Sequence, residues 1–152
     1  MTSVELSWHE RSFADLKTAQ LYAIVALRER VFVVEQNCVY LDADGIDLRA
    51  RHMWAEHDGV LHAYLRIVPA GLKFPEVSIG RVIIAPEARR TGLGKELMRR
   101  GISAANGTHE PIRVGAQAHL EKFYAELGFA VASAPYLEDN IPHLEMLRPA
   151  GS

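Results

Sequence analysis

The sequence has little that would tie it to an oxidising compartment, a membrane or a nucleic acid. Its 152 residues include one cysteine, Cys38, so no disulfide can form within the chain, and we expect a reducing, cytoplasmic environment. The formal net charge of −2 excludes a uniformly basic nucleic-acid-binding protein. No apolar run approaches the roughly 20 residues that span a bilayer. The N-terminal residues also lack the basic and apolar segments of a secretory signal, so we expect none.

What is present is the composition of an ordinary globular domain. Hydrophobic residues make up 49% of the chain and charged residues 24%. A chain of this length buries on the order of 70% of its unfolded surface, which is enough for a core without a disulfide or structural metal. No internal repeat or linker interrupts it, so we expect a single domain over residues 1–152.

Hydrophobic periodicity predicts a mixture of helices and strands. Helical spacing predicts helices over 18–34, 92–105 and 118–127. Extended runs predict strands over 51–57, 60–68, 77–84, 112–117, 129–133 and 143–148. Asp58-Gly59 is a signal for a tight hairpin turn, and residues 37–47 form a loop long enough to suspect of function. With a further strand before residue 18, the order β-α-β-β-β-α-β-α-β-β indicates an α/β fold, with a mixed sheet and helices on both faces.

The most informative segment runs from Ile84 to Lys95, from a strand through a basic turn into a helix. A helix N-terminus exposes unpaired N–H groups and the positive end of the helix dipole, so it can bind a phosphate or pyrophosphate. Two glycines would let the anion approach the backbone, and three basic side chains add charge. A dinucleotide fingerprint is disfavoured, because Leu97 stands where its third glycine would be, and no P-loop motif occurs. The alternative is a helix start with a solvated basic cap.

Two motifs in this sequence resemble those of the GNAT N-acetyltransferase superfamily. Arg89-x-x-Gly92-x-Gly94, preceded by an apolar strand and Pro86, resembles the family's pyrophosphate-binding motif. Downstream, the segment 117–129 (QAHLEKFYAELGF) is similar to the family's late helix with its F-Y-x-x-L-G-F ending. Two motifs in the family's order are more specific than either alone.

A narrower resemblance is to the ElaA-type subfamily and covers most of residues 28–146. It is carried by VFVVEQNC at 31–38, Y-x-D-x-D-G-x-D at 40–47, GAQAHL at 115–120 and IPH at 141–143. Asn140 departs from the pattern, because a glycine is expected there, which puts the local turn in doubt.

The resemblance implies the GNAT fold, with a mostly antiparallel sheet that is splayed at a cofactor cleft, and it implies acetyl-CoA as cofactor. The cleft would lie between the strand ending near Ile84 and the strand at 112–117. Main-chain groups of β-strand residues 82–84 would pair with the pantetheine arm, and the Val82 amide would polarise the thioester carbonyl. Amides across 90–95 would hold the pyrophosphate. The implied cofactor-binding residues are Val82, Ile83, Ile84, Arg89, Arg90, Thr91, Gly92, Leu93, Gly94, Lys95, Gln117, Phe123 and Tyr124.

Tyr124 stands at the family's usual position for the acid that protonates the departing CoA thiolate. A phenol with a reference pKa near 10 is protonated at neutral pH and can serve in this way. The alternative is a half-buried aromatic residue on an amphipathic helix.

The general base is left open by the sequence. Some family members use a glutamate on the strand before the pyrophosphate loop, but the spacing places Ser78 there, and an alcohol is no base at neutral pH. The remaining candidates are Glu35, His119, Glu138 and His143, or a chain of water molecules.

Arg66 and Arg81 are charges within otherwise apolar strands. Such charges need solvent, a partner or a ligand, so the two could clamp a substrate carboxylate. The alternative is that both pair with aspartates of the 42–47 loop. The residues expected to contact the acceptor are Glu35, Arg66, Arg81, His119 and His143.

The acidic loop itself, Asp42-x-Asp44-Gly45-x-Asp47, does not fit a calcium loop, because its glycine comes too early and no bidentate glutamate follows. We expect it at the substrate mouth, where acidic groups would attract an amine; the alternative is a solvated turn. The histidines and the single cysteine show no metal-binding spacing, so we expect no metal.

Together these features predict an N-acetyltransferase that moves an acetyl group from acetyl-CoA to a primary amine by direct attack. The acceptor would be a small molecule or a peptide, with no nucleic acid or membrane as partner, and the family resemblance favours a homodimer. The alternatives are transfer of a longer acyl group, because residues 28–47 are also loosely similar to acyl-homoserine-lactone synthases, and a non-catalytic CoA-binding module.

Overall fold

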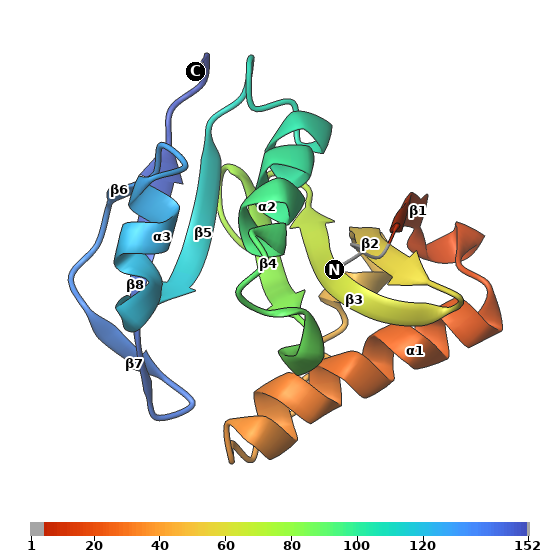
Figure 1. Ribbon diagram of the computed structural model, residues 1–152. Coiled ribbons are helices and arrows are strands. Elements are labelled where there is room, and N and C mark those ends of the chain that lie inside the picture. Colours follow the sequence, from red (N-terminus) through yellow and green to blue (C-terminus); the bar gives the residue numbers. More distant parts are fainter. Residues whose placement is uncertain (1–4, 152) are drawn as a thin grey trace.

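The computed structural model describes residues 5–151, which form one curved mixed sheet with helices on both faces (Figure 1). The sheet order is β1-β2-β3-β4-β5-β8-β6, with β7 paired to β8 beside it. All neighbours are antiparallel except β4 and β5. The strands are β1 (Ser7–Ser12), β2 (Arg51–His57), β3 (Val60–Val68), β4 (Val77–Ile84), β5 (Ile112–Gln117), β6 (Ala130–Val131), β7 (Tyr136–Glu138) and β8 (Ile141–Arg148).

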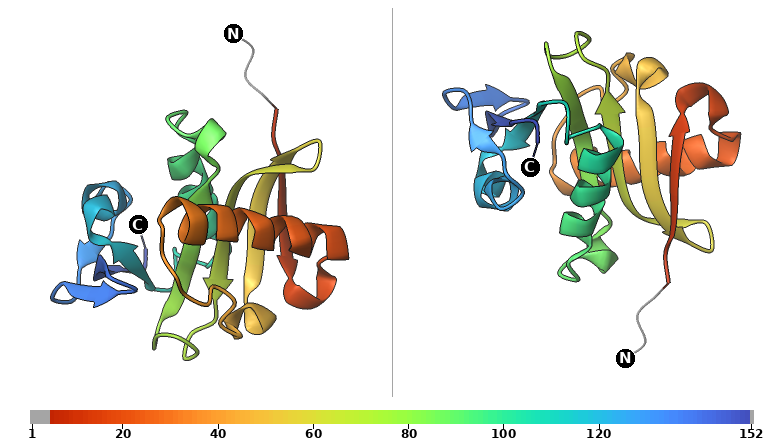
Figure 2. Two further views of the ribbon diagram at one scale, coloured as in Figure 1. Left: turned by 90° about the horizontal axis from the view of Figure 1, so that it is seen from below. Right: turned by 90° about the horizontal axis from the view of Figure 1, so that it is seen from above.

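The helices cover opposite faces of this sheet, as the two views of Figure 2 show. One face carries α1 (Thr18–Arg28), which continues as a π-helix over Glu29–Glu35. The other carries α2 (Leu93–Ala104) and the short α3 (Glu121–Ala125). Short 3-10 turns lie at Phe13–Asp15, Ile46–Arg49, Pro86–Ala88 and Ala118–Leu120. Within residues 5–151, no helix is both long and apolar enough to cross a membrane.

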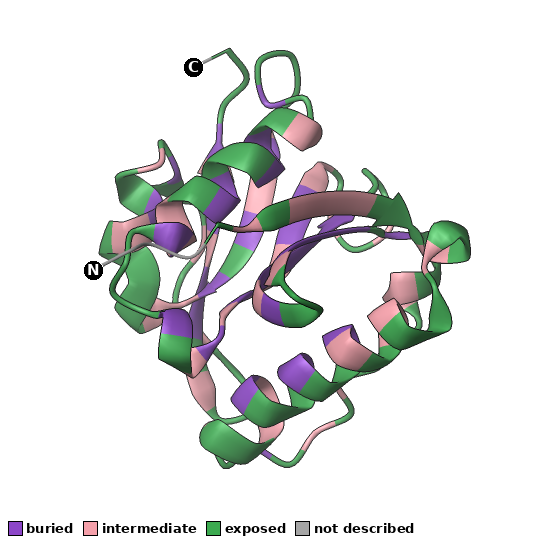
Figure 3. Ribbon diagram, turned by 45° about the vertical axis from the view of Figure 1, so that its right-hand side comes forward, coloured by how far each residue is buried: buried purple, intermediate pink, exposed green. Residues whose placement is uncertain are grey.

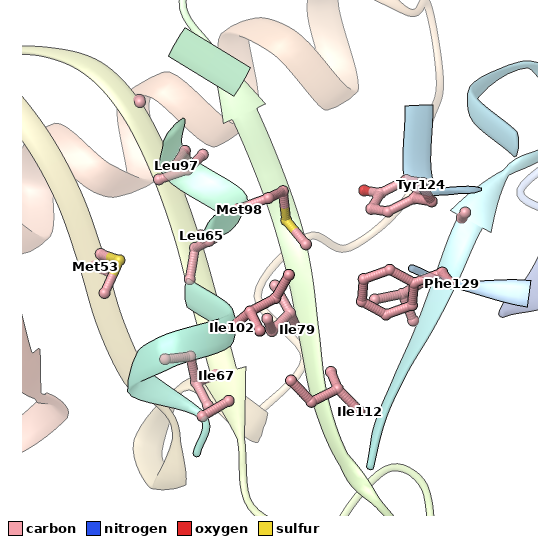
Figure 4. Close-up of a cluster of buried hydrophobic side chains, with 14 of the residues drawn as sticks. Met53, Leu65, Ile67, Ile79, Leu97, Met98, Ile102, Ile112, Tyr124 and Phe129 are labelled. Atoms are coloured by element: carbon pink, nitrogen blue, oxygen red, sulfur yellow. The ribbon is translucent and has the colours of Figure 1, made fainter. Parts of the chain in front are cut away.

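The apolar stripe of each long helix faces the sheet, which holds the layers together. On α2, Leu97 and Met98 are fully buried against β3 and β4. They belong to the same apolar cluster as Tyr124 and Phe129 (Figure 4). On α1, Ile24 and its neighbours on the sheet side pack on Trp54, Tyr64 and Ile83, and the purple patches on that helix in Figure 3 mark this buried stripe. Burying a large aliphatic side chain contributes about 1.5–3 kcal/mol, so these two layers fix the sheet between them.

The sheet opens between β4 and β5. The two strands pair only at Val77↔Ile112 and Ser78↔Arg113 and then separate. A bulge in β4 accompanies the separation: Tyr64 pairs with Ile83 but Arg66 pairs with Gly80, so β4 carries an extra residue there. Within the bulge Arg81 has a φ of +50°, which is unusual for a residue with a side chain. The result is a V-shaped opening whose walls are the C-terminal ends of two neighbouring strands.

The mixed sheet with helices on both faces is confirmed, as is the hairpin of β2 and β3. Asp58 and Gly59 both have positive φ, as the tight turn requires. The doubt about Asn140 is resolved in favour of a turn: Asp139 and Asn140 both adopt left-handed φ values, which asparagine tolerates, and they connect β7 to β8.

Three predicted elements differ most from the observed ones. The helix predicted over 18–34 is α-helical only to Arg28, because the chain then widens into the π-helix. Just after the π-helix, the Cys38 amide donates to the Val33 carbonyl, five residues back. The helix predicted over 118–127 begins as a 3-10 turn and is α-helical only over Glu121–Ala125. The strand predicted over 129–133 is ordered as β6 for two residues only, and β7 was missed.

Candidate active site

A cavity of about 1040 Å³ follows the opening between β4 and β5. Because side chains alternate along a strand, the two walls expose different sets to the two faces of the sheet. Ile79, Val82 and Ile84 pack on the α2 and α3 side, whereas Ile83 packs against α1. The cavity therefore has a half beside α2 and α3, bordered by Gly94 and Phe123, and a half on the α1 side, lined by Tyr40, Lys73, Phe74, Glu138 and His143, among others.

The half beside α2 provides groups that suit a phosphate-bearing chain. The N-cap of α2 is Gly92, with φ +81° and no side-chain cap, so the amides of the first helical turn have no partner within the helix. Gly94 borders the cavity, and a Cβ there would lie 3.4 Å from Phe123 Cε1 and 3.7 Å from Ile84 Cγ1. Beyond Ser78 the edge of β4 that faces β5 has no ladder partner among the described residues. Unpaired β4 main-chain groups followed by a free helix N-terminus fit the pantetheine arm and pyrophosphate of an acyl-CoA.

The residues predicted to bind the cofactor divide into two groups. One group lines the cavity: Val82, Ile83, Ile84, Arg89, Gly94, Gln117, Phe123 and Tyr124. The other, Arg90, Thr91, Gly92, Leu93 and Lys95, forms the turn and first turn of α2 and stands outside the described lining of the cavity. Within this second group the Lys95 ammonium pairs with Glu126, and Leu93 is buried in the core. For Leu93 and Lys95, a part in anion binding would thus come from the backbone.

Tyr124 presents its hydroxyl to the cavity. Its ring packs edge-on against Phe123 and Phe129, with centroids 5.1 Å and 5.7 Å away. The side chain is 5% exposed, and its hydroxyl points from α3 toward β4 (Figure 4). No other group in residues 5–151 forms a hydrogen bond with this hydroxyl. Burial raises the pKa of the Tyr124 phenol, so the phenol is protonated at neutral pH.

Glu35 and Arg89 form a bidentate ion pair at the lip of the cavity, with distances of 2.6 Å and 2.7 Å. These hydrogen bonds hold the pKa of Glu35 below its usual value and raise the pKa of Arg89. Glu35 is therefore a stable carboxylate whose oxygens are already engaged, which makes it a poor general base.

The acidic loop is neutralised by arginines from three elements. Asp42 binds Arg28 at 2.7 Å and Arg81 at 2.8 Å, and it also accepts a hydrogen bond from Tyr40. The aspartates named for an amine-attracting mouth are thus part of an internal ion-pair network. The loop therefore does not form the acidic, amine-attracting substrate mouth that the sequence favours, since little uncompensated charge is left in it.

Arg66 takes the pairing that was the alternative to a substrate clamp. It is 1% exposed and binds Asp44 at 2.7 Å and Asp47 at 2.9 Å. Asp47 in turn binds Arg28 at 2.7 Å, so one carboxylate joins α1 to β3. Burial opposes ionisation of Asp44 and Asp47, but the hydrogen bonds and charges of the arginines outweigh it and hold the pKa of both carboxyls below normal.

Arg28 is the network member that the prediction missed. It stands on the apolar stripe of the first helix, four residues after Ile24, and it is 2% exposed. A charge at a core-facing helical position is itself a signal of a buried partner. His52 of β2 also holds this loop in place. Its Nε2 donates to the Asp47 carbonyl at 3.0 Å, and its Nδ1 accepts from the Tyr64 hydroxyl at 2.6 Å.

The remaining predicted residues lie on different sides of the cavity. His119 is an exposed residue of the 3-10 turn before α3 and borders the cavity there. His143 is buried on β8, beside Glu138 of β7. In the described part of the chain, no three histidine, cysteine, aspartate or glutamate residues are grouped as metal ligands would be.

Comparison with known proteins places this architecture in a family. Residues 32–148 match the model of the "Acetyltransferase (GNAT) domain". This chain belongs to the GNAT acetyltransferase family. The match includes nearly the whole cavity lining, from Phe32 to His143. GNAT proteins are acyl-CoA-dependent N-acyltransferases, and the observed sheet is the GNAT fold.

The chain is similar to ElaA-type members of this family. It is 40% identical to the protein ElaA of Escherichia coli over 149 residues, which are 94% of this chain and 96% of that protein. A crystal structure of an acyl-CoA N-acyltransferase from Pseudomonas aeruginosa is 43% identical, with a TM-score of 0.90 over 95% of this chain and 99% of that chain. The crystal structure of E. coli ElaA is 38% identical, with a TM-score of 0.88 over 95% and 99% of the two chains.

Proposed function

We propose that this protein transfers an acetyl group from acetyl-CoA to a primary amine, by direct attack of the amine on the thioester. The observation that carries the proposal is the opening between β4 and β5, which joins a helix N-terminus suited to pyrophosphate with a separate half of the cavity on the α1 side. An acceptor entering from the α1 side would meet the acyl end of the cofactor at the bulge in β4.

Acetyl-CoA would supply an activated acyl carbon and a thiolate leaving group. The Val82 amide follows the bulge in β4 and would hold the thioester carbonyl oxygen, which gains charge as the amine attacks. Tyr124, whose phenol has no hydrogen bond within residues 5–151, would donate its proton to the sulfur. The backbone of residues 92–95 would bind the pyrophosphate.

Direct attack is supported by the side chains that line the cavity. The cysteine and serine among the described lining residues, which are the usual residue types for an acyl-enzyme intermediate, are Cys38 and Ser78. The thiol of Cys38 is buried and donates to the Asp139 carbonyl at 3.3 Å, so it faces an acceptor that cannot remove its proton. Ser78 is 2% exposed and forms no hydrogen bond with a base in residues 5–151.

The half of the cavity on the α1 side, here called the acceptor half, has a surface with balanced charge. Its arginines are neutralised by aspartates, and aromatic faces are supplied by Tyr40 and Phe74. We infer that the acceptor is a small amine or the amine of a peptide, recognised by shape and by aromatic contact more than by net charge.

Isothermal titration with acetyl-CoA tests the cofactor site. We expect a dissociation constant of about 1 μM–1 mM, as is usual for enzyme substrates. Gly94→Glu places a carboxylate in the cavity and should abolish binding, whereas Gly94→Ala, whose Cβ makes only ordinary contacts, should retain it. If the folded wild-type protein does not bind, the basic turn is only a helix cap and the proposal fails. Tighter binding of octanoyl-CoA than of acetyl-CoA would favour a longer acyl group.

A further inference from the structure

His143 is held in one orientation by its neighbours on the sheet. It stands on β8, where it pairs with Gln117 of β5 on one side and with Tyr136 of β7 on the other. The Tyr136 ring stacks on the imidazole, with a centroid distance of 5.8 Å and an interplanar angle of 29°. The side chain is buried and lines the acceptor half of the cavity.

The hydrogen bond to Ile141 decides which ring nitrogen of His143 carries the proton. His143 Nδ1 lies 2.7 Å from the Ile141 carbonyl oxygen. A carbonyl can only accept, so Nδ1 must donate, and the lone pair of the neutral ring is on Nε2. Ile141 precedes His143 by two residues on the same strand, so the strand itself imposes this tautomer.

Glu138 lies where it can receive a proton from Nε2. Its Oε2 is 3.4 Å from His143 Nε2, and in the neutral state both atoms are acceptors and do not bond. Once Nε2 is protonated, the carboxylate faces a cation. The Glu138 side chain is 48% exposed and that of His143 is 9% exposed, so the pair runs from the cavity to solvent.

The other candidates for the general base are less suited. Glu35 is held as a carboxylate by Arg89, and Ser78 is an alcohol. His119 is exposed beside α3 and is not held by any hydrogen bond within residues 5–151.

We propose that His143 is the general base of the acyl transfer, accepting the proton of the acceptor amine on Nε2 and passing it through Glu138 to solvent. This inference rests on the proposed function. The fold alone does not specify this catalytic residue. The assignment depends on the tautomer of His143, which a local hydrogen bond to the Ile141 carbonyl on the same strand determines.

The protons balance as follows. An acceptor that arrives as an ammonium ion loses one proton to His143 Nε2, and this proton leaves through Glu138. The neutral amine then forms the N–C bond while the C–S bond breaks. The second proton lost from nitrogen is again taken by Nε2, while Tyr124 gives its proton to sulfur and regains one from solvent. The net reaction converts an ammonium ion and a thioester into an amide, a thiol and one released proton.

The titratable groups around His143 come from several segments of the chain. Tyr136 and Glu138 of β7 contact it, and Lys73, Cys38 and Asp139 line the same cavity from other segments.

The first test is independent of any acceptor. Nitrogen-15 NMR of the histidine-labelled protein near pH 8, with His143→Gln to assign the signals, reports which ring nitrogen is protonated. We expect His143 to be the Nδ1–H tautomer. A neutral ring protonated on Nε2 would overturn the proposal, because the lone pair would then face the backbone.

The second test uses turnover with a panel of tyramine, putrescine and a lysine-containing peptide. For His143→Gln we expect kcat to fall by about 10²–10⁴-fold, the usual contribution of general acid–base catalysis. The dissociation constant for acetyl-CoA should stay unchanged, which also shows that the variant is folded. His109→Gln, on the surface turn after α2, is the matched control and should keep the wild-type kcat.

The outcomes separate the two proposals. If the wild-type protein acetylates an amine and His143→Gln does so equally well, the general-base assignment is wrong and the proposed function stands. If the wild-type protein binds acetyl-CoA but acetylates no amine in the panel, the proposed function fails, and the catalytic role of His143 fails with it.

Discussion

At the residue scale, single polar side chains are prepared for distinct tasks by their surroundings. Tyr124 keeps its proton because burial raises its pKa, and its hydroxyl has no competing partner within residues 5–151. Glu35 is engaged by Arg89, and Arg66 by two aspartates. By residue type alone, all three could have a catalytic role. Only their contacts distinguish the unbonded phenol from the two side chains that are engaged in ion pairs.

Replacing Tyr124 by phenylalanine removes the proposed acid and leaves the ring packing. We expect kcat for acetyl transfer to fall by about 10²–10⁴-fold. Titration should show that the acetyl-CoA affinity is retained, since the phenol is not expected to hold the cofactor in its ground state. A variant with wild-type kcat would show that Tyr124 is only a packing residue of α3.

Replacing Asp47 by asparagine breaks the carboxylate link between Arg28 and Arg66. Both guanidinium groups are almost fully buried, so we expect a loss of about 3–5 kcal/mol in the free energy of unfolding, measured by urea denaturation. Glu87→Gln removes an exposed pair with Arg30 and serves as the control, with a much smaller expected loss because solvent screens the pair. Equal small losses would mean that the network contributes little to stability.

At the element scale, the four central strands β2–β5 have the bounds that the sequence predicts. The bounds of β2, β3, β4 and β5 follow from apolar runs with clear turn signals at Asp58-Gly59 and Pro86. The π-helix after α1 was not predictable from periodicity, because its residues remain apolar on the sheet side while the backbone widens. The short β7 has too few residues for a pattern, although Asp139-Asn140 is a turn signal that could have revealed it.

The site could be predicted only in part, because a sequence pattern reports local structure and the site also depends on contacts between distant elements. The Arg89–Gly94 turn and the Phe123–Tyr124 pair are local motifs, so the sequence places them on their elements. The pairing of the aspartates with Arg28, Arg66 and Arg81 depends on how α1, β3 and β4 meet in space. The spacing of these residues along the chain does not determine how the three elements pack together.

The open edge of β4 and the start of α2 give a prediction for these two elements. We expect amide hydrogen exchange over residues 79–84 and 92–95 to slow when acetyl-CoA is added, because main-chain groups without ladder or cap partners acquire them. In Gly94→Glu the same amides should exchange at the same rate with and without acetyl-CoA. Protection confined to other segments would place the cofactor elsewhere.

At the scale of the whole molecule, two parts meet at a narrow join. The part with β1–β4, α1 and α2 contacts the part with β5–β8 and α3 through the two residue pairs of the β4–β5 ladder and through the packed core (Figure 1). On the acceptor side Cys38 bonds the Asp139 carbonyl, and Gln36 lies 3.3 Å from Gln117. The cavity is thus a property of the assembled sheet, since both parts line it.

The pH dependence of unfolding should reflect the ion-pair network. The pKa values of Asp44 and Asp47 are lowered in the folded protein, so the unfolded chain binds their protons more readily. Their contribution to stability is then complete above the unfolded value of about 4 and is lost as pH falls below it toward the lowered folded values. Urea denaturation from pH 6 down to pH 3 should show stability falling below about pH 4. In Asp47→Asn the fall should be smaller, and an equal fall would assign the effect to other carboxyls.

The central claim is that the cavity between β4 and β5 joins acetyl-CoA to an amine. The most direct measurement is mass spectrometry of a mixture of the protein, acetyl-CoA and primary amines, searched for an acetylated amine. We predict product with the wild-type protein, none above background with Gly94→Glu, and about 10²–10⁴-fold slower formation with Tyr124→Phe. Tight binding of acetyl-CoA without an acetylated product from any amine would contradict the claim and identify the protein as a CoA-binding module.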